Sequence, residues 1–346
     1  MKKTLCLILA ALMLLGALAS CDSGNAPEDT TVEHTTLEDT AADGMTTSAE
    51  GAQSAPSAES VNIKVMTFNL QSAYRTDERI KNVQTVIKEN PADVYCFQEA
   101  NTWDGDFSGF EDLSIVRQTN ITGSGCRIYY NNKALTYKKA GTYRLMKKGD
   151  RVNAMLCKHD TYCSYAVFEH RETKKQFLVI NAHLDYGSNP AVRRAQAKLI
   201  VEKLETDLAD YKELPMVLVG DMNSESAEVS IKYLMKTQYF SWAKQAEGVE
   251  FVAENAPDLN GGNDGSPTII TDAFKMEFPN NSTADSVAEE NGLYLYRTVI
   301  DYIFVSKNGS ITPLKYEIVY RNFAKKEGYW KYASDHMPVV CEMIIN

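Results

Sequence analysis

The feature that most constrains this chain is a set of short apolar runs. Each run ends at a polar residue with a carboxylate, imidazole or amide side chain. Runs of this length, rich in Val and Ile and bounded by polar residues or Gly, are typical of buried strands. If these runs are strands, their polar neighbours converge on one rim of a sheet. The polar residues at the ends of the runs are, in chain order, Asn69, Gln98 and Glu99, His183, Asp221, Asp301, and Asp335 and His336.

Helical patterns separate several of these runs. Residues 77–89, 190–208 and 226–236 carry apolar side chains at helical spacing, and Pro190 suits a first helical position. Residues 126–182 instead alternate in the manner of β-hairpins. The order strand, helix, strand, hairpin block, strand, helix, strand predicts an α/β fold with two packed sheets and helices on the outer faces.

The N-terminal residues 1–20 have the pattern of an export signal. Lys2 and Lys3 precede an apolar stretch and then small residues. The segment ends in Leu-Ala-Ser before Cys21, which resembles the lipobox of bacterial lipoproteins, in which this Cys is lipidated. We therefore expect an extracytoplasmic protein, lipid-anchored to the bacterial cell membrane at Cys21. The alternative is an ordinary cleaved signal with a chance Cys beside the cleavage site.

The stretch 21–60 is predicted to be an acidic, disordered tether. It contains nine Asp and Glu residues, no Lys or Arg, and too little apolar surface to offset the entropy of ordering it. The whole chain of 346 residues has a net charge of −10; the signal contributes +2 and the tether −9, which leaves −3 for the domain 61–346. The acidic balance therefore does not exclude a phosphate-bearing substrate, although it disfavours strong non-specific DNA binding.

Five cysteines lie in the domain, and the odd number means that at least one is unpaired. Cys96 and Cys341 lie in apolar runs and are expected to be buried. Cys157 and Cys163 flank a polar turn, so a disulfide across a hairpin is one of two open alternatives, free thiols being the other.

Six short motifs follow one another along the domain: TFN (67–69), QE (98–99), NAHLD (181–185), GDMN (220–223), IDYIFVS (300–306) and SDHMPV (334–339). Their order resembles that of the endonuclease/exonuclease/phosphatase superfamily, which has the DNase-I-like fold. The resemblance covers nearly all of 61–346 and implies a four-layered α/β sandwich, two packed mixed β-sheets flanked by helices. It also implies magnesium-dependent hydrolysis of phosphate esters.

The resemblance also implies roles for individual residues. Glu99 would bind the metal, with Asn69 and Asp335 helping directly or through water. His336 would act as general base or transition-state stabiliser, oriented by Asp301. The remaining implied catalytic residues are Asp221 for the attacking water, Asn223 for the phosphoryl oxygens and His183 for the other side of the phosphate.

These residue types suit phosphate chemistry on independent grounds. A phosphate ester and hydroxide are both anionic, so a site needs a hard cation to draw charge from the phosphoryl oxygens. Carboxylate and amide oxygens are the ligands that Mg²⁺ prefers, and Mn²⁺ or Ca²⁺ could occupy the same donors. A His paired with a carboxylate has a fixed tautomer and a raised pKa.

Several of these residues also have a simpler structural interpretation. Asn223 could cap the helix that begins near Ser226, and His183 could be a buried core histidine. Asp185 could pair with Arg193 or Arg194, which lie in the first turn of 190–208. Positive charge there opposes the helix dipole and indicates an anionic neighbour, either Asp185, which we favour, or a substrate phosphate. Trp330 could form a wall of the pocket.

The sequence leaves the phosphate ester itself open. DNA, RNA, phospholipid, inositol phosphate and sugar phosphate all remain candidates, and the polar insert 253–267 could shape the site. The expected partners are the substrate and the membrane through the lipid anchor, with no obligate protein partner. Two non-enzymatic alternatives are a catalytically silent surface lipoprotein that uses the fold for binding, and a solute-binding lipoprotein of a transporter.

Overall fold

The computed structural model describes most of the domain that the sequence predicts. The signal, the tether with Cys21, most of the insert 253–267, and Trp330 lie outside the described residues. Within the described part of the chain, no helix combines the length and the apolar character needed to cross a membrane. The described residues are 60–71, 75–117, 123–186, 189–253, 268–270, 295–297, 299–321, 323 and 333–346.

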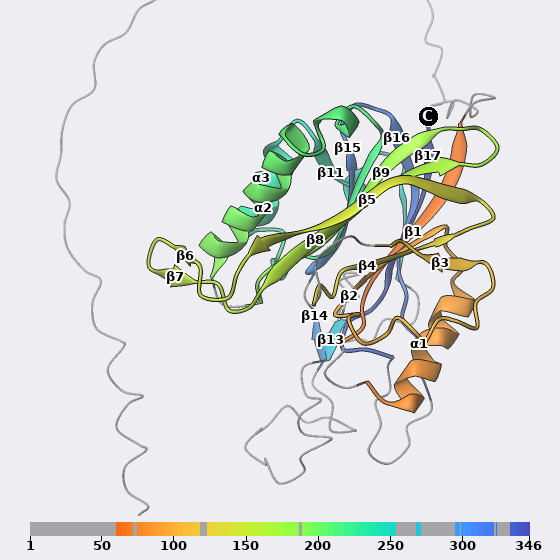
Figure 1. Ribbon diagram of the computed structural model, residues 1–346, viewed down its shortest axis with the longest axis horizontal. Coiled ribbons are helices and arrows are strands. Elements are labelled where there is room, and N and C mark those ends of the chain that lie inside the picture. Colours follow the sequence, from red (N-terminus) through yellow and green to blue (C-terminus); the bar gives the residue numbers. More distant parts are fainter. Residues whose placement is uncertain are drawn as a thin grey trace, which may run out of the picture. The chain divides into compact units, whose positions relative to one another are not determined.

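Two mixed β-sheets form the centre of the fold (Figure 1). The first has seven strands in the order β12-β16-β17-β1-β2-β4-β3, and the second has six in the order β11-β15-β10-β9-β8-β5. The strands of the first sheet are β1 (Val61–Asn69), β2 (Val94–Gln98), β3 (Leu113–Ile115), β4 (Arg127–Asn131), β12 (Glu250–Val252), β16 (Ile311–Ile318) and β17 (Val339–Ile345). Those of the second are β5 (Leu135–Met146), β8 (Thr161–His170), β9 (Gln176–His183), β10 (Met216–Asp221), β11 (Phe240–Trp242) and β15 (Asp301–Ser306).

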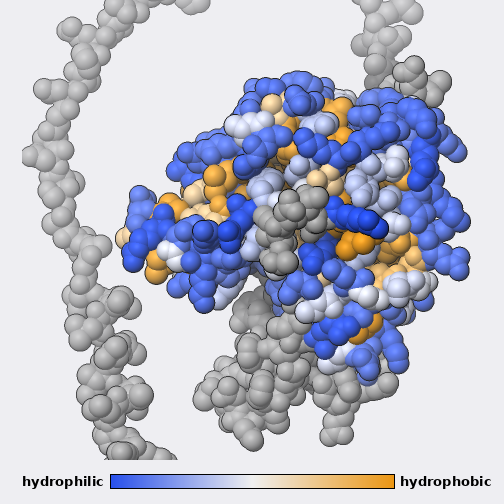
Figure 2. Space-filling view, viewed as in Figure 1, coloured by the Kyte–Doolittle hydropathy of each residue, from blue (hydrophilic) through white to orange (hydrophobic). Residues whose placement is uncertain are grey.

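Two small two-stranded sheets and the helices complete the described structure. Figure 2 shows apolar surface at the end of the β6–β7 hairpin, where Met155 and Leu156 are exposed. The elements are β6 (Arg151–Val152) with β7 (Met155–Leu156), β13 (Thr268–Ile270) with β14 (Leu295–Arg297), α1 (Asp77–Glu89), α2 (Pro190–Glu205), α3 (Val229–Lys236), and the 3₁₀ turns η2 (Ala209–Tyr211) and η3 (Ala243–Gln245).

The helices cover the outer faces of the sheets, so the predicted four-layered sandwich is confirmed (Figure 1). The side chains of β1 alternate between two cores because successive residues of a strand point to opposite faces. Val65 packs in the core between the sheets, while Met66 and Phe68 pack against Val83 of α1. Strands buried on both faces explain why the sequence shows continuous apolar runs.

The helix boundaries differ slightly from the expectation. Thr76 caps α1 by accepting a hydrogen bond from the Arg79 amide, and this helix matches 77–89. Helix α2 ends at Glu205, before 208, because the Leu208 amide bonds to the Lys203 carbonyl and closes the last turn. Helix α3 starts three residues later than 226–236, since Glu228 still has an extended backbone.

The five cysteines of the domain are buried free thiols, so the Cys157–Cys163 disulfide alternative is wrong. The two side chains lie in different packing clusters. Cys163 belongs to the large core between the sheets, whereas Cys157 packs with Met146 and Val192 near the start of α2. Burial raises the pKa of the Cys157 thiol to about 11, which keeps it protonated.

Candidate active site

The strand ends converge on one rim of the two sheets, as the sequence pattern predicts. Parallel pairing puts Asn69 of β1 beside Gln98 of β2, and His183 of β9 beside Asp221 of β10. Strand β15 runs antiparallel to β10, so its first residue Asp301 lies opposite Asp221. The register of the strands therefore brings together groups that are far apart in the sequence.

Unusual backbone geometry accompanies the rim. Gln71, Glu99 and Asn223 have φ values of 48°, 51° and 46°, in the left-handed region that residues other than Gly seldom adopt. Gly220 has a φ of 137°, and a Cβ there would lie 1.9 Å from the Ala182 carbonyl oxygen. Only Gly fits this position, which explains the Gly that precedes Asp221 in the GDMN motif.

Asp221 lies at the centre of the constellation and is almost completely buried. Its Oδ2 accepts a hydrogen bond from Asn69 Nδ2 at 2.9 Å and lies 3.4 Å from His183 Nε2 and 3.7 Å from His336 Nε2. Its Oδ1 accepts the Asn223 backbone amide at 2.8 Å. One carboxylate thus joins residues of both sheets.

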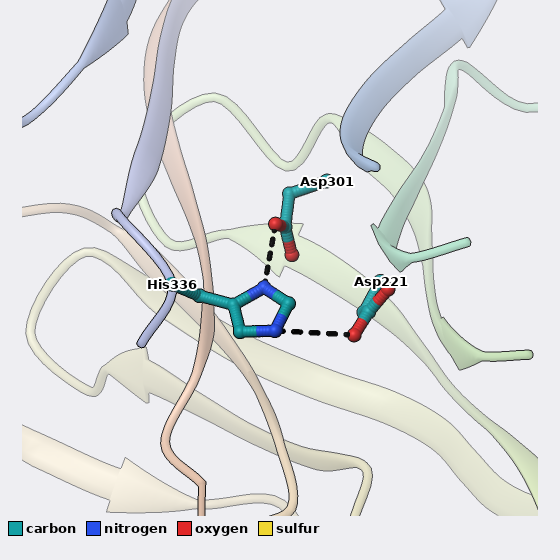
Figure 3. A group of neighbouring side chains, drawn as sticks. All are labelled: Asp221, Asp301 and His336. Carbon is teal, nitrogen blue, oxygen red and sulfur yellow. Dashed lines mark hydrogen bonds and ion pairs between the residues drawn. The ribbon is translucent and has the colours of Figure 1, made fainter. Parts of the chain in front are cut away.

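His336 is held between two carboxylates (Figure 3). Its Nδ1 lies 2.8 Å from Oδ2 of the buried Asp301, and its Nε2 faces Asp221. Burial acts to lower the pKa of His336, but the charges of Asp301 and Asp221 outweigh it and raise the pKa well above the ordinary value. The two carboxylates therefore favour the protonated imidazole.

A second group of oxygen donors lies beside this cluster. Asn69 Nδ2 also donates to Glu99 Oε1 at 3.3 Å, and Gln71 Nε2 donates to Asp335 Oδ2 at 2.7 Å. The buried Arg79 in turn donates to Gln71 Oε1 at 3.1 Å. Burial raises the pKa of Asp335 to about 6, His336 opposes this shift, and the nearby charge of Glu99 adds to it. Such mutual repulsion between carboxylates is relieved by a bound cation.

Two sets of side chains could hold a metal ion. Asp221, Asp301 and His336 have ligand atoms within 4.8 Å of one another. However, Nδ1 of His336 is already occupied by its hydrogen bond to Asp301. Glu99 and Asp335, with the Oδ1 of Asn69, offer only oxygen donors, although this Oδ1 also accepts the Gln71 backbone amide at 2.9 Å.

Asn223 and His183 face the same cavity, which Glu99 and His336 also line. Asn223 does not cap α3, because that helix starts six residues later and the Asn223 side-chain amide donates to the Leu184 carbonyl at 2.9 Å. His183 lies at the edge of the core with its ring near Asp221. Both residues therefore lie beside the space that a substrate would occupy.

The expected roles of Arg193 and Asp185 need correction. Arg193 is buried and donates to Glu228 Oε2 at 2.7 Å and to Ser224 Oγ at 2.9 Å. Its anionic neighbour is thus Glu228, and neither the Asp185 carboxylate nor a substrate phosphate is needed to explain its charge. Asp185 instead accepts the backbone amide of Lys158 at 2.8 Å.

His159 is a site residue that the sequence analysis does not single out. Its ring lines the cavity with His183, at 6.1 Å between ring centroids. No local pattern marks it, because its position depends on a contact with Asp185, which lies beyond the next two strands.

Comparison with known proteins defines the class. The model of the endonuclease/exonuclease/phosphatase family matches residues 66–336, so the chain belongs to this family. The members of this family are hydrolases that act on phosphate esters.

Solved structures share the fold. An endonuclease/exonuclease/phosphatase family protein from Bacteroides thetaiotaomicron has a TM-score of 0.61 at 20% identity, over 83% of this chain and 96% of that one. A mannosyl-6-phosphatase of the same species has a TM-score of 0.60 at 20% identity, over 81% of this chain and 99% of that one. The human Nocturnin catalytic domain has a TM-score of 0.51 at 19% identity, over 82% and 93%.

One curated relative matches over a shorter region. It is a probable CCR4-Not complex 3′-5′-exoribonuclease subunit from Vairimorpha ceranae, 24% identical over 184 residues. The match covers 46% of this chain and 38% of the relative. The proteins to which this chain is similar thus include a phosphatase and a probable exoribonuclease, and they do not fix a substrate.

Proposed function

We propose that the protein is a divalent-metal-dependent phosphoesterase that hydrolyses a phosphodiester or phosphomonoester by in-line attack of an activated water. The observation that carries the proposal is the position of Asp221, whose Oδ2 lies within 3.7 Å of both His183 Nε2 and His336 Nε2. A buried carboxylate between two imidazoles suits the orientation of a water and of a phosphoryl group.

The chain's own residues divide the work. Asp221 positions or deprotonates the water, while Asn223 and His183 contact the phosphoryl oxygens. His336 faces the same space. In its protonated form it is a cation, and Asp301 keeps its ring oriented. A protonated imidazole stabilises the charge that develops on phosphate oxygens, so transition-state stabilisation is the role that the raised pKa of His336 favours.

Mg²⁺ is the proposed cation, with Mn²⁺ or Ca²⁺ as substitutes, and Glu99, Asn69 and Asp335 are the proposed ligands. Their donors are oxygens, and Asp335 has a pKa raised by burial and by Glu99, both of which fit a hard divalent ion. When bound, the ion draws charge from the phosphoryl oxygens. Gln71 and Arg79 would hold the Asp335 side of this set in place.

The site of action is proposed to be outside the cytoplasm, with the domain tethered to the membrane through Cys21. The support is the sequence of residues 1–60 alone. Labelling with a radioactive or alkyne fatty acid, followed by membrane fractionation, tests this. Wild type should be labelled and sediment with membranes, whereas Cys21→Ser should lose the label; an unlabelled wild type would contradict lipidation.

A panel of substrates tests the enzyme. It compares p-nitrophenyl phosphate, bis(p-nitrophenyl) phosphate, plasmid DNA, RNA, inositol phosphates, sugar phosphates and sphingomyelin, with Mg²⁺ and with chelator. Glu99→Gln and Asp221→Asn should remove nearly all turnover, while Glu213→Gln, at an exposed glutamate away from the cavity, should not. Activity that survives chelator and Glu99→Gln would exclude the metal mechanism. An inactive wild type would favour the alternative, a silent lipoprotein that uses the fold for binding.

A further inference from the structure

The cavity extends beyond the residues that handle the phosphate. It has a volume of about 420 Å³, and one wall comes from the segment between β7 and the start of β8 together with the residues after β9. His159, Asp160 and Tyr162 lie on the first of these segments, and Tyr186 lies on the second. The proposed catalytic residues leave this wall without a role.

His159 is fixed in this wall by a buried carboxylate. Oδ1 of Asp185 accepts the backbone amides of Lys158 at 2.8 Å and His159 at 3.4 Å, and it lies 3.2 Å from His159 Nδ1. Asp185 is fully buried, and its own amide donates to Gln196 Oε1 at 2.9 Å. The loop and the ring are therefore set by a single side chain that does not itself line the cavity.

The ring of His159 has hydrogen-bonding capacity that the described residues leave unused. Its Nδ1 is buried 3.2 Å from Asp185 Oδ1 but makes no hydrogen bond with it. Burial lowers the pKa of His159, and the neighbouring His183 adds to this shift against the charge of Asp185. A neutral imidazole has one donor and one acceptor nitrogen, and either can pair with a hydroxyl group.

Tyr186 adds an aromatic face. Its ring stacks on His159 with 4.5 Å between centroids and an interplanar angle of 20°, and the residue is 67% exposed. An exposed aromatic ring at the rim of a cavity offers a flat apolar face on which another ring can pack. One face of the ring is covered by His159, which leaves the other as a platform.

Asp160 adds a paired carboxylate to the wall. The hydrogen bond from the Lys148 backbone amide lowers its pKa, so it is ionised at neutral pH. Tyr162 donates its hydroxyl to the same carboxylate, and Arg144 Nη1 lies 3.2 Å from its Oδ2. The charge of Asp160 is therefore balanced by Arg144, and the wall offers hydrogen-bonding groups that suit hydroxyls.

We propose that His159, Asp160 and Tyr186 form a subsite for the alcohol portion of the substrate, and that this portion is a ring rich in hydroxyls, as in a sugar phosphate monoester. The subsite rests on the proposed function. His159 and Asp160 form hydrogen bonds with the hydroxyls, Tyr186 packs on the ring of the alcohol, and Asp185 is a positioning residue that acts through His159.

The test measures steady-state kinetics of the full chain with Mg²⁺. The probes are glucose 6-phosphate, mannose 6-phosphate, ribose 5-phosphate, glycerol 3-phosphate, a short oligonucleotide and phenyl phosphate. The best hydroxylated monoester should exceed phenyl phosphate in kcat/KM at least tenfold. His159→Phe, which keeps a flat ring, should reduce that ratio about tenfold, mainly through KM, as expected for one lost hydrogen bond.

Matched variants separate this role from simple damage to the fold. Asp185→Asn keeps an oxygen that accepts the two backbone amides, but it removes the charge beside His159. It should therefore also raise KM, while kcat changes less. His170→Phe, at a histidine on the far end of β8, should leave the ratio unchanged.

The outcomes are distinguishable. A wild type that hydrolyses none of the probes contradicts the proposed function. A wild type that cleaves phenyl phosphate as well as any sugar phosphate, or prefers the oligonucleotide, overturns the subsite and leaves the proposed function standing. An unchanged substrate ratio in His159→Phe also overturns it.

Discussion

Gln98 Nε2 donates a hydrogen bond of 2.7 Å to Asn181 Oδ1, and this contact joins the two sheets directly beneath the candidate active site. Both side chains are fully buried. Asn181 also donates to the carbonyls of Phe97 and Arg127, each at 2.9 Å. The amides of the QE and NAHLD motifs thus fix the distance between Glu99 and His183, which follow them on the two sheets.

Replacing Asn181 tests this contact. Asn181→Ala should lower the free energy of unfolding by about 3 kcal/mol, since it leaves buried carbonyls and the Gln98 amide without partners. Urea denaturation measures the loss. Asn62→Ala, at an exposed asparagine of β1, is the control and should change stability by less than about 0.5 kcal/mol. Equal effects of the two substitutions would show that the contact has no special importance.

Gly220 should tolerate no side chain. Gly220→Ala would place a Cβ 1.9 Å from the Ala182 carbonyl oxygen and hold Ala at a φ of 137°. We expect a loss of about 3 kcal/mol or more, or a failure to fold. Gly248→Ala, which also has positive φ but open space around it, should cost about 1 kcal/mol. A Gly220→Ala variant as stable as Gly248→Ala would contradict the packing described between β9 and β10.

The sequence predicts the fold and the main group of active-site residues because both depend on local sequence patterns. Each strand ends at a polar residue, and parallel neighbours must then share a rim. The contacts of Arg193 and His159 were not predictable in this way. The first turn of α2 indicates an anion near Arg193, but its partner Glu228 lies 35 residues away. His159 acquires its place only through Asp185, which no periodicity reveals.

The ion pair of His336 and Asp301 should govern both rate and pH dependence. Asp301→Asn keeps the shape but removes the charge that orients the ring, so kcat should fall about 10³-fold. The pKa of His336 should also fall, because burial then acts without its strongest opponent. NMR titration of the imidazole measures this shift directly, and an unchanged His336 pKa in Asp301→Asn would contradict the assignment.

The ion pair of His336 and Asp301 also predicts how the stability of the protein changes with pH. A His whose pKa is raised on folding contributes stability that is fully present below its unfolded pKa of about 6.5 and is lost as pH rises through the folded pKa. The advantage of wild type over His336→Gln in urea should therefore be largest below about pH 6.5 and shrink at alkaline pH. An advantage that grows as the solution becomes alkaline would mean that the ring is neutral in the folded protein.

Divalent metal should stabilise the protein more at pH 8 than at pH 5. The pKa of Asp335 is raised to about 6 by burial, so this carboxyl is protonated at pH 5 and ionised at pH 8, where it repels Glu99 and attracts a cation. For a metal that binds in the millimolar range or tighter, 10 mM Mg²⁺ should raise Tm by roughly 3 °C or more at pH 8.

Asp335→Asn should raise Tm in chelator at pH 8, because it removes a poorly solvated charge, and should weaken the response to Mg²⁺. Glu99→Gln should also weaken the response, whereas Asp112→Asn, at an exposed carboxylate paired with Lys133, should leave it intact. Calorimetric scans of the four proteins, with Mg²⁺ and with Ca²⁺, measure these shifts. Equal responses in wild type and Glu99→Gln would place the cation elsewhere, and among the described residues Asp221, Asp301 and His336 would then be the set to substitute next.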